Sequence, residues 1–358
     1  MTAVNAPTET PTETDAAPGL ESHRHLGTGA TWGLTGAGLA GGALLGLLAG
    51  SWAVGAVAGL LLVLVALPGV SWRVEGARRG KDRAFTVVVT VAFLLALLPL
   101  LSLIYSTLTN GLARFDPEFF TSDMRAVLGE GGGALHAIVG TLLITGSATL
   151  ISVPIGIMCA IYLVEYGKGR LARMVTILVD VMTGIPSIVA GLFAFALFSI
   201  FFGPSIRFGL GGAVALSLLM VPVVVRSVEE MLKLVANELR EASYALGVPR
   251  WRTIVKVVLP TAGAGIAAGV TIAIARVIGE TAPLLIIAGS TTNLDWNIFE
   301  GRMMTLPVFT YESYMIPGVP PEPGVDRAWA AALTLMVIVM GLNLAARLIA
   351  RLFGTKSR

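Results

Sequence analysis

The feature of this sequence that most constrains its fold is a series of long apolar runs along almost the whole chain. A bilayer core of about 30 Å requires about 20 apolar residues in a helix. No backbone polar group can remain unsatisfied in lipid, and the alternating pattern at ten-residue intervals that barrel strands need is absent, so each run is expected to be helical. Charged residues make up only 13% of the 358 residues, roughly half the fraction usual in soluble domains. We predict eight spans, at 30–49, 53–69, 84–107, 135–163, 174–202, 210–225, 262–288 and 328–350.

The first apolar stretch, from residue 30 to residue 70, is too long for one span. Gly50 and Ser51 mark a turn inside it, so we expect a hairpin of two helices. The preceding segment is rich in Pro, Thr and Glu, and it offers too little apolar surface to order itself. The predicted organisation is a disordered cytoplasmic tail (1–27), a transmembrane hairpin (28–70), a basic cytoplasmic linker (71–83) and a six-helix core (84–352). The fold class is an all-α polytopic membrane protein.

Lys and Arg residues are distributed unequally between alternate connections. Segments 71–83, 166–173 and 226–256 together with the C-terminal end hold 18 of them, whereas the intervening connections hold five. Basic residues flank membrane spans mainly on the cytoplasmic side. We therefore expect both termini to lie in the cytoplasm.

Several functional classes lack the residues that they need. No basic face interleaved with aromatic residues is present, so we expect no nucleic-acid partner. The sequence contains no phosphate-binding loop of the G-x-x-x-x-G-K-[ST] type and no HExxH pair. The single cysteine, Cys159, and the three histidines do not combine at metal-ligand spacing. We expect no metal site, no cofactor on this chain and no hydrolysis of ATP by it.

The longest connection on the predicted cytoplasmic side, 227–260, has the pattern of a helix–turn–helix. Gly247 and Pro249 end one amphipathic helix, and a second begins at Arg250. Apolar residues on two short helices at an aqueous boundary favour a docking partner over a simple connector. In the first helix the apolar positions at helical spacing are Met231, Leu232, Val235, Leu239, Ala242 and Leu246.

The same segment resembles the EAA loop of bacterial ABC importer permeases. The matching residues are Glu241-Ala242-Ser243, three residues, Gly247, nine residues, and then Val257-Val258-Leu259-Pro260. The family pattern has Ala at position 243 and Ile at position 257. We expect Ser243 and Val257 to preserve the size and surface character of those residues. The resemblance implies a six-helix permease core whose loop docks a cytoplasmic ATPase, with Gly247 supplying a turn at positive φ.

Two further segments resemble the PstA-type permeases of phosphate-specific importers. Residues 180–193 read DVMTGIPSIVAGLF and residues 276–285 read RVIGETAPLL. The resemblance covers roughly residues 84–352. It implies inward conduction of inorganic phosphate across the bacterial inner membrane. It also implies a PstC-like second permease subunit, two copies of an ATPase subunit that holds ATP and Mg, and an extracytoplasmic phosphate-binding protein.

Three charged residues lie well inside the predicted spans, namely Asp180, Arg276 and Glu280. Each costs about 2.5–3.5 kcal/mol at the bilayer centre, so each is a functional candidate. Arg276 and Glu280 are four residues apart and are expected to pair on one helix face, which small residues at 265, 269 and 273 extend. For Asp180 we favour helix packing or pairing with an arginine, Arg276 being one candidate. The expected substrate pathway comprises Arg276, Glu280, Asp180, Ser187 and Thr281.

The sequence leaves several alternatives open. The Arg276–Glu280 pair could hold a span in place rather than bind substrate. The same machine could carry another oxyanion, such as sulfate, molybdate or tungstate. A secondary transporter without an ATPase would show inverted repeats, and no second copy of the 227–260 pattern is found. A membrane scaffold for phosphate sensing is a further reading.

Overall fold

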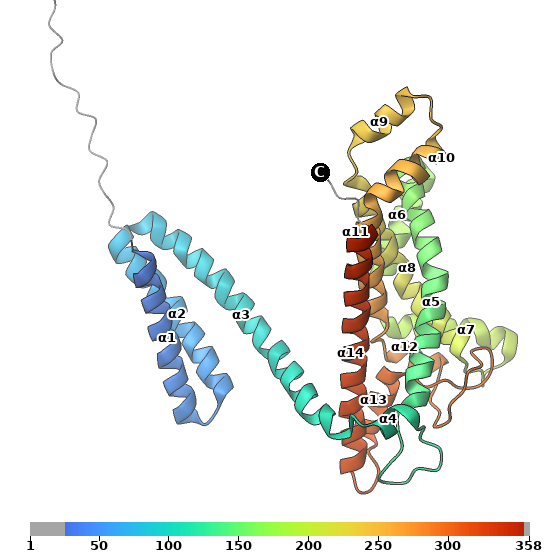
Figure 1. Cartoon of the computed structure of the whole chain (residues 1–358), viewed down its shortest axis with the longest axis horizontal. Coiled ribbons are helices and arrows are strands. Elements are labelled where there is room, and N and C mark those ends of the chain that lie inside the picture. The colour runs from blue at the N-terminus through green and yellow to red at the C-terminus, as the bar shows by residue number, and fades with distance from the viewer. Residues whose placement is uncertain (1–25, 354–358) are drawn as a thin grey trace, which may run out of the picture. The chain divides into compact units, whose positions relative to one another are not determined.

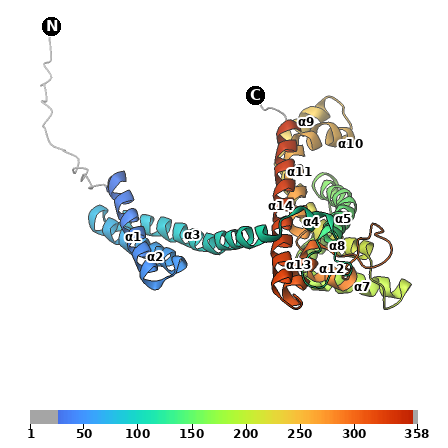
Figure 2. The same ribbon diagram turned by 60° about the horizontal axis from the view of Figure 1, so that its bottom comes forward.

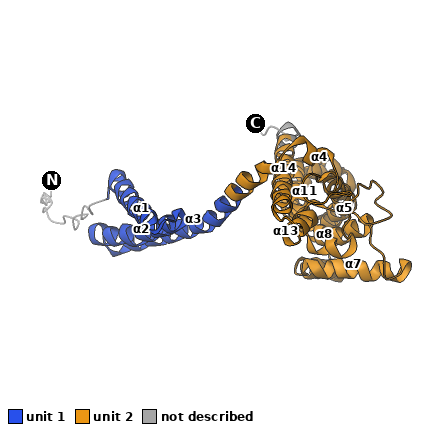
Figure 3. Ribbon diagram, turned by 90° about the horizontal axis from the view of Figure 1, so that it is seen from below, with its two compact units in different colours: residues 1–104 blue, residues 105–358 orange. Residues whose placement is uncertain are grey.

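The computed structural model describes residues 26–353, and these residues form helices and loops without a strand. The predicted tail (1–27) therefore lies almost entirely outside the described residues. The chain divides into two compact units, residues 1–104 and 105–358 (Figure 3). Each unit is described by itself.

Unit 1 contains the predicted hairpin. It comprises α1 (Thr28–Ala49), α2 (Trp52–Glu75) and most of α3 (Ala77–Gly111). Gly50, at the turn, has φ 64°, a conformation that glycine adopts without strain. A Cβ added to Gly42 would lie 2.2 Å from the Cα of Gly59. The two backbones are thus in direct contact, as small residues permit between membrane helices.

A buried carboxylate joins the segment before α1 to α2 and α3 at one end of this unit. Glu75, the last residue of α2, accepts hydrogen bonds from the Leu26 amide at 2.8 Å and the Ser71 hydroxyl at 2.6 Å. Its ion pair with Arg83 measures 2.9 Å. The basic segment 71–83 is helical on both sides of Gly76, and Glu75 fastens the start of α1 to it.

Unit 2 is the larger helical bundle, shown from two directions in Figures 1 and 2. Its first half contains η1 (Leu112–Arg114), α4 (Pro117–Thr121), α5 (Leu135–Ile161), the π-helical η2 (Tyr162–Tyr166), α6 (Arg170–Thr183), α7 (Ser187–Phe202) and α8 (Gly209–Lys233). Its second half contains α9 (Asn237–Ala245), α10 (Arg250–Thr253), the π-helical η3 (Ile254–Val258), α11 (Leu259–Val277), α12 (Ala282–Ile287), α13 (Leu306–Met315) and α14 (Glu322–Phe353).

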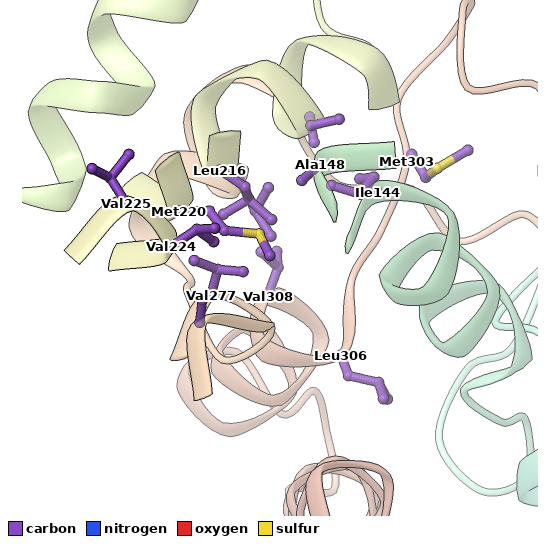
Figure 4. Close-up of a cluster of buried hydrophobic side chains, with 14 of the residues drawn as sticks. Ile144, Ala148, Leu216, Met220, Val224, Val225, Val277, Met303, Leu306 and Val308 are labelled. Atoms are coloured by element: carbon purple, nitrogen blue, oxygen red, sulfur yellow. The ribbon is translucent and has the colours of Figure 1, made fainter. Parts of the chain in front are cut away.

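The core of unit 2 lies between α5, α8, α11 and α13. Figure 4 shows Ile144 and Ala148 of α5 beside Leu216, Met220 and Val224 of α8, all of them fully buried. Val277 of α11 and Val308 of α13 complete the cluster. Helix α8 is the central element, because it presents buried residues along most of its length. Figures 1 and 2 place α7 and α14 on opposite sides of this bundle.

Within residues 26–353, seven helices are long and apolar enough to cross a membrane, and the predicted total of eight is reached if α6 and α7 count as one span. The predicted span 174–202 is a broken one, because α6 and α7 are bent by 108° at residues 184–186. Pro186 lacks an amide proton and restricts the residue before it, and Gly184 has a low helix propensity, so both residues favour a break here.

The predicted span 262–288 is also interrupted. Helix α11 ends at Val277, and α12 begins at Ala282. Gly279 and Glu280 lie in the break between the two helices. A second broken helix is therefore present in the part of unit 2 that contains the predicted pathway residues.

Candidate translocation site and docking loop

The two broken helices meet each other. A Cβ added to Gly191 of α7 would lie 2.5 Å from the Cα of Pro283 in α12. Gly191 belongs to the segment 180–193 and Pro283 to the segment 276–285, which are far apart in the sequence. The fold thus brings together the two segments that resemble phosphate permeases.

This contact leads to a test of the site architecture. Gly191→Val should separate α7 from α12, because the obstructing atoms belong to the backbone and to the proline ring. Overpacking of this kind costs about 1–3 kcal/mol, and we expect a lower melting temperature of the purified protein. Gly146→Val is the matched control, since no atom lies within 4 Å of a Cβ at this helical glycine of α5. Equal destabilisation by both substitutions would contradict the proposed contact.

The structure places four of the predicted pathway residues in the segments that meet here. Arg276 is exposed in the last turn of α11, and Glu280 is half-buried in the break that follows. Thr281 directly precedes α12, and Ser187 is the first residue of α7, one turn before Gly191. Both of these side chains are half-buried.

The expected pairing of Arg276 with Glu280 is wrong. Among the described residues, no ion pair or hydrogen bond joins the two side chains. The expectation assumed a continuous helix, in which residues four apart share a face. Because α11 ends at Val277, Glu280 no longer follows the helical spacing.

Asp180 does pair with an arginine, although not with Arg276. Its carboxylate accepts a hydrogen bond from Arg226 of α8. Arg226 also pairs with Glu229 at 2.8 Å, and Glu229 pairs with Lys233 at 2.7 Å. A chain of alternating charges therefore runs from α6 along one face of α8. Glu229, whose side chain is 11% exposed, is neutralised from both sides.

Arg226, Glu229 and Lys233 were not predicted as site residues, because the apolar run that predicts the span ends at residue 225. In the structure α8 continues to Lys233 without a break. The sequence did contain a signal for this series of ion pairs, since positions 226, 229 and 233 are spaced three and four residues apart. That spacing places the three side chains on one helix face.

The small residues of α11 form a packing surface rather than a free face. A Cβ on Gly265 would lie 2.4 Å from the sulfur of Met231, and a Cβ on Gly269 would lie 2.6 Å from Cβ of Ser227. The expected pathway-lining face through 265, 269 and 273 is therefore occupied by α8. Two of the expected pathway residues, Asp180 and Ser187, lie on opposite sides of the bend between α6 and α7.

The loop 227–260 contains two short helices, but the first begins later than predicted, because Met231 and Leu232 belong to α8, which continues to Lys233. Helix α9 ends at Ala245 and α10 begins at Arg250, as the sequence predicted. Gly247 between them has φ 77°, which confirms the expected left-handed turn. Glu241 and Ala242 are exposed on α9. The exposed apolar side chains of this end are Leu234, Leu239, Tyr244, Leu246, Trp251 and Val255.

Ser243 differs from its expected character. It is buried, and its hydroxyl lies 2.8 Å from the Thr253 hydroxyl of α10. The serine therefore joins the two short helices instead of contributing to the surface. Val257 and Leu259 are half-buried, and Pro260 is exposed near the start of α11. Helical residues 250–259 precede Pro260 without a gap, so the proline lies within a continuous helical segment.

At the opposite end of unit 2, loop segments 122–134 and 289–305 are tied together. Asp123 accepts hydrogen bonds from the amide of Arg125 at 3.1 Å and from the amide of Leu294 at 3.3 Å. The Arg125 amide, helped by the Leu294 amide, lowers the pKa of Asp123 below its ordinary value. The carboxylate is therefore ionised at neutral pH, and it holds the two segments in a fixed arrangement.

Comparison with known proteins gives a consistent family assignment. The family model described as "Binding-protein-dependent transport system inner membrane component" matches residues 152–358. The chain is 45% identical to "Phosphate transport system permease protein PstA 1" of Mycobacterium tuberculosis (strain ATCC 25618 / H37Rv) over 284 residues, which cover 78% of this chain and 91% of that protein. It is 40% identical to the PstA protein of Yersinia pestis over 275 residues, which cover 76% and 90% respectively.

The fold is similar to that of solved ABC importers. A chain of a bacterial transporter involved in the import of the acidic polysaccharide alginate aligns with a TM-score of 0.53 and 15% identity. The alignment covers 78% of this chain and 100% of that chain. At this level of identity, the likeness concerns the fold alone.

Proposed function

The chain belongs to the PstA family of phosphate transport permeases, and from this premise we propose how it moves phosphate and how it is driven. It is the permease subunit of a phosphate ABC importer and not itself the ATP-hydrolysing component. The proposed pathway passes Arg276, Glu280 and Thr281 around the α11–α12 break and Ser187 at the start of α7. The contact of Gly191 with Pro283 is the observation on which this proposal mainly rests.

Arg276 is the proposed phosphate ligand in this pathway. Its guanidinium offers several donors in a planar arrangement that matches phosphate oxygens. Because Arg276 is exposed and has no acidic partner among the described residues, it is available to a passing anion. A single exposed ligand binds weakly, which suits a site that must also release its ion.

Asp180 has a different proposed role. Its ion pair with Arg226 connects α6 to α8 beside the break between α6 and α7. The carboxylate would compete with phosphate for the Arg226 guanidinium. The pair is therefore proposed to hold the two helices together between transport events.

The loop of α9 and α10 is the proposed docking site for the cytoplasmic ATPases. Its exposed apolar residues, among them Leu246 and Trp251, need a covering partner at an aqueous boundary. Two copies of an ATPase subunit would hold ATP and Mg, one against this loop and one against the corresponding loop of a PstC-like second permease. The closure of the ATPases would then be transmitted to the membrane helices as a rigid displacement of α9.

The proposed orientation follows from charge. The connections that are rich in Lys and Arg, together with the α9–α10 loop and the end of α14, are placed in the cytoplasm. Both termini then lie on the cytoplasmic side of the bacterial inner membrane. The opposite end, with the segments 122–134 and 289–305 fixed by Asp123, would face an extracytoplasmic phosphate-binding protein.

Uptake of radiolabelled phosphate tests this proposal directly. The chain would be supplied with its three partner components to cells that lack their own high-affinity system. We expect uptake that requires the ATPase subunit and that persists in excess sulfate and molybdate. Uptake without the ATPase would contradict the docking proposal. Competition by sulfate or molybdate at equal strength would contradict selectivity for phosphate.

A further inference from the structure

Arg240 lies at the joint between the docking loop and the membrane helices. It belongs to α9 and directly precedes Glu241. Its Nε and Nη2 atoms donate to Oε1 of Glu165 at 3.0 and 2.9 Å. The two side chains are only 12% and 6% exposed. An ion pair this deeply buried is costly to break, because removing one partner leaves the other charge without compensation.

The same guanidinium also binds the end of α8. Nη2 donates to the carbonyl oxygen of Leu232 at 2.9 Å, and Nη1 donates to that of Val235 at 2.6 Å. Carbonyl groups at a helix C-terminus have no partner within the helix, and a cation there is further favoured by the helix dipole. Arg240 thus fastens α9 to α8 as well as to Glu165.

Glu165 connects Arg240 to a second long helix, α5. It lies in the π-helical turn η2, which continues α5 without a gap. Such turns within α-helices occur frequently at functional sites. Helix α5 packs along α8 through buried residues such as Ile144 and Ala148. One arginine of the docking loop therefore holds both of the central helices of unit 2.

Helix α8 also contains Arg226, six residues before Leu232 on the same unbroken helix. A displacement of α9 that moves the end of α8 would therefore reach the Asp180–Arg226 ion pair through one rigid element. Apart from Arg240, the described hydrogen bond that ties α9 to another helix is the Ser243–Thr253 pair, and it leads through α10 and η3 to α11 and not to α5 or α8.

We propose that Arg240 and Glu165 are positioning residues that transmit the movement of α9 to α5 and α8. This inference rests on the proposed docking of an ATPase at α9 and α10. Without the ion pair, the loop would still present its docking surface. Its movement would no longer displace α5 and α8, so ATP hydrolysis would continue while phosphate transport declined.

The test uses the complete transporter with its binding protein in proteoliposomes. The variants are Glu165→Gln, Arg240→Gln and the double variant, with Lys168→Gln as the control. Lys168 is an exposed charged residue three positions from Glu165. Three quantities are measured for each: the amount of ATPase that co-purifies, the rate of ATP hydrolysis, and the phosphate imported per ATP hydrolysed.

We expect every variant to retain its ATPase and to hydrolyse ATP within about twofold of the unmodified protein. Phosphate imported per ATP should fall in Arg240→Gln by about 5- to 150-fold, the usual range for coupling between two sites. In Glu165→Gln the phosphate imported per ATP should fall less, because Arg240 keeps its hydrogen bonds to the carbonyl oxygens of Leu232 and Val235. The double variant should lose no more than Arg240→Gln, since the two residues act as a unit. Lys168→Gln should match the unmodified protein.

If ATP hydrolysis and phosphate uptake fall by the same factor in Arg240→Gln while the ATPase stays bound, the phosphate imported per ATP is unchanged. Hydrolysis and transport would then still be coupled, and the proposal would be overturned. If Arg240→Gln does not reach the membrane, the proposal is tested with Glu165→Gln instead. An equal import per ATP in Glu165→Gln and Lys168→Gln would overturn the proposal, and a lower value in Glu165→Gln would support it. If no ATPase co-purifies with the unmodified protein, the docking itself fails, which contradicts the proposed function rather than this inference alone.

Discussion

Replacing Arg276 with alanine should reduce phosphate uptake by about 10- to 150-fold, because a hydrogen bond to a charged group contributes about 1.5–3 kcal/mol. The side chain is exposed in the last turn of α11, and no acidic partner neutralises it among the described residues. Its loss should therefore leave the fold intact. Uptake and membrane level are measured together in the reconstituted system.

Two companion variants sharpen this prediction. Arg276→Lys keeps the charge and loses the planar donor arrangement, so its uptake should lie between the unmodified protein and Arg276→Ala. Arg173→Ala removes an exposed arginine from the first turn of α6 and should change uptake by less than about twofold, as most surface substitutions do. If Arg276→Ala resembles Arg173→Ala, Arg276 is not part of the pathway.

Replacing Gly247 with valine should uncouple the permease from its ATPase. The φ of 77° at this position is strained for any residue with a Cβ, and more so for a β-branched one. No atom lies within 4 Å of an added Cβ, so the effect comes from the backbone and not from a clash. A left-handed conformation costs about 1–2 kcal/mol outside glycine. Co-purification of the ATPase and phosphate uptake should each fall by roughly 5- to 30-fold.

Gly247→Asn is the matched control, because asparagine adopts positive φ far more readily than valine. It should retain most of the ATPase binding and most of the uptake. An equal loss in both variants would mean that side-chain size at the docking surface matters, and not the direction of the turn. An unchanged uptake in Gly247→Val would exclude this loop as the docking element.

The docking loop was the part of the site best predicted from sequence. The positions of Gly247 and Pro249 correctly placed the end of one helix and the start of the next, because glycine and proline act on the backbone locally. The expectation that Ser243 has surface character was wrong, because burial depends on residues distant in the sequence. Its burial depends on Thr253, which is brought beside it only when the two helices fold against each other.

For the charged residues within the spans, the sequence likewise identified some features and missed others. The sequence identified Asp180 and Arg276 from their cost in lipid, which needs only hydropathy. It did not identify the partner of Asp180, because Arg226 follows the apolar run and was assigned to a loop. Helices do not end where hydrophobicity ends, and α8 extends to Lys233 through three charged residues at helical spacing.

The sequence by itself determined the fold class, the approximate spans, the hairpin turn, the turn at Gly247 and the family, because hydropathy, glycine and proline act over short distances along the chain. Only the tertiary structure decided where α11 ends, which charges pair, and which faces are occupied. Arg276 and Glu280 are separated by the end of α11, and Arg240 reaches Glu165 across 75 residues. Contacts of this kind depend on packing between distant segments, which no local pattern encodes.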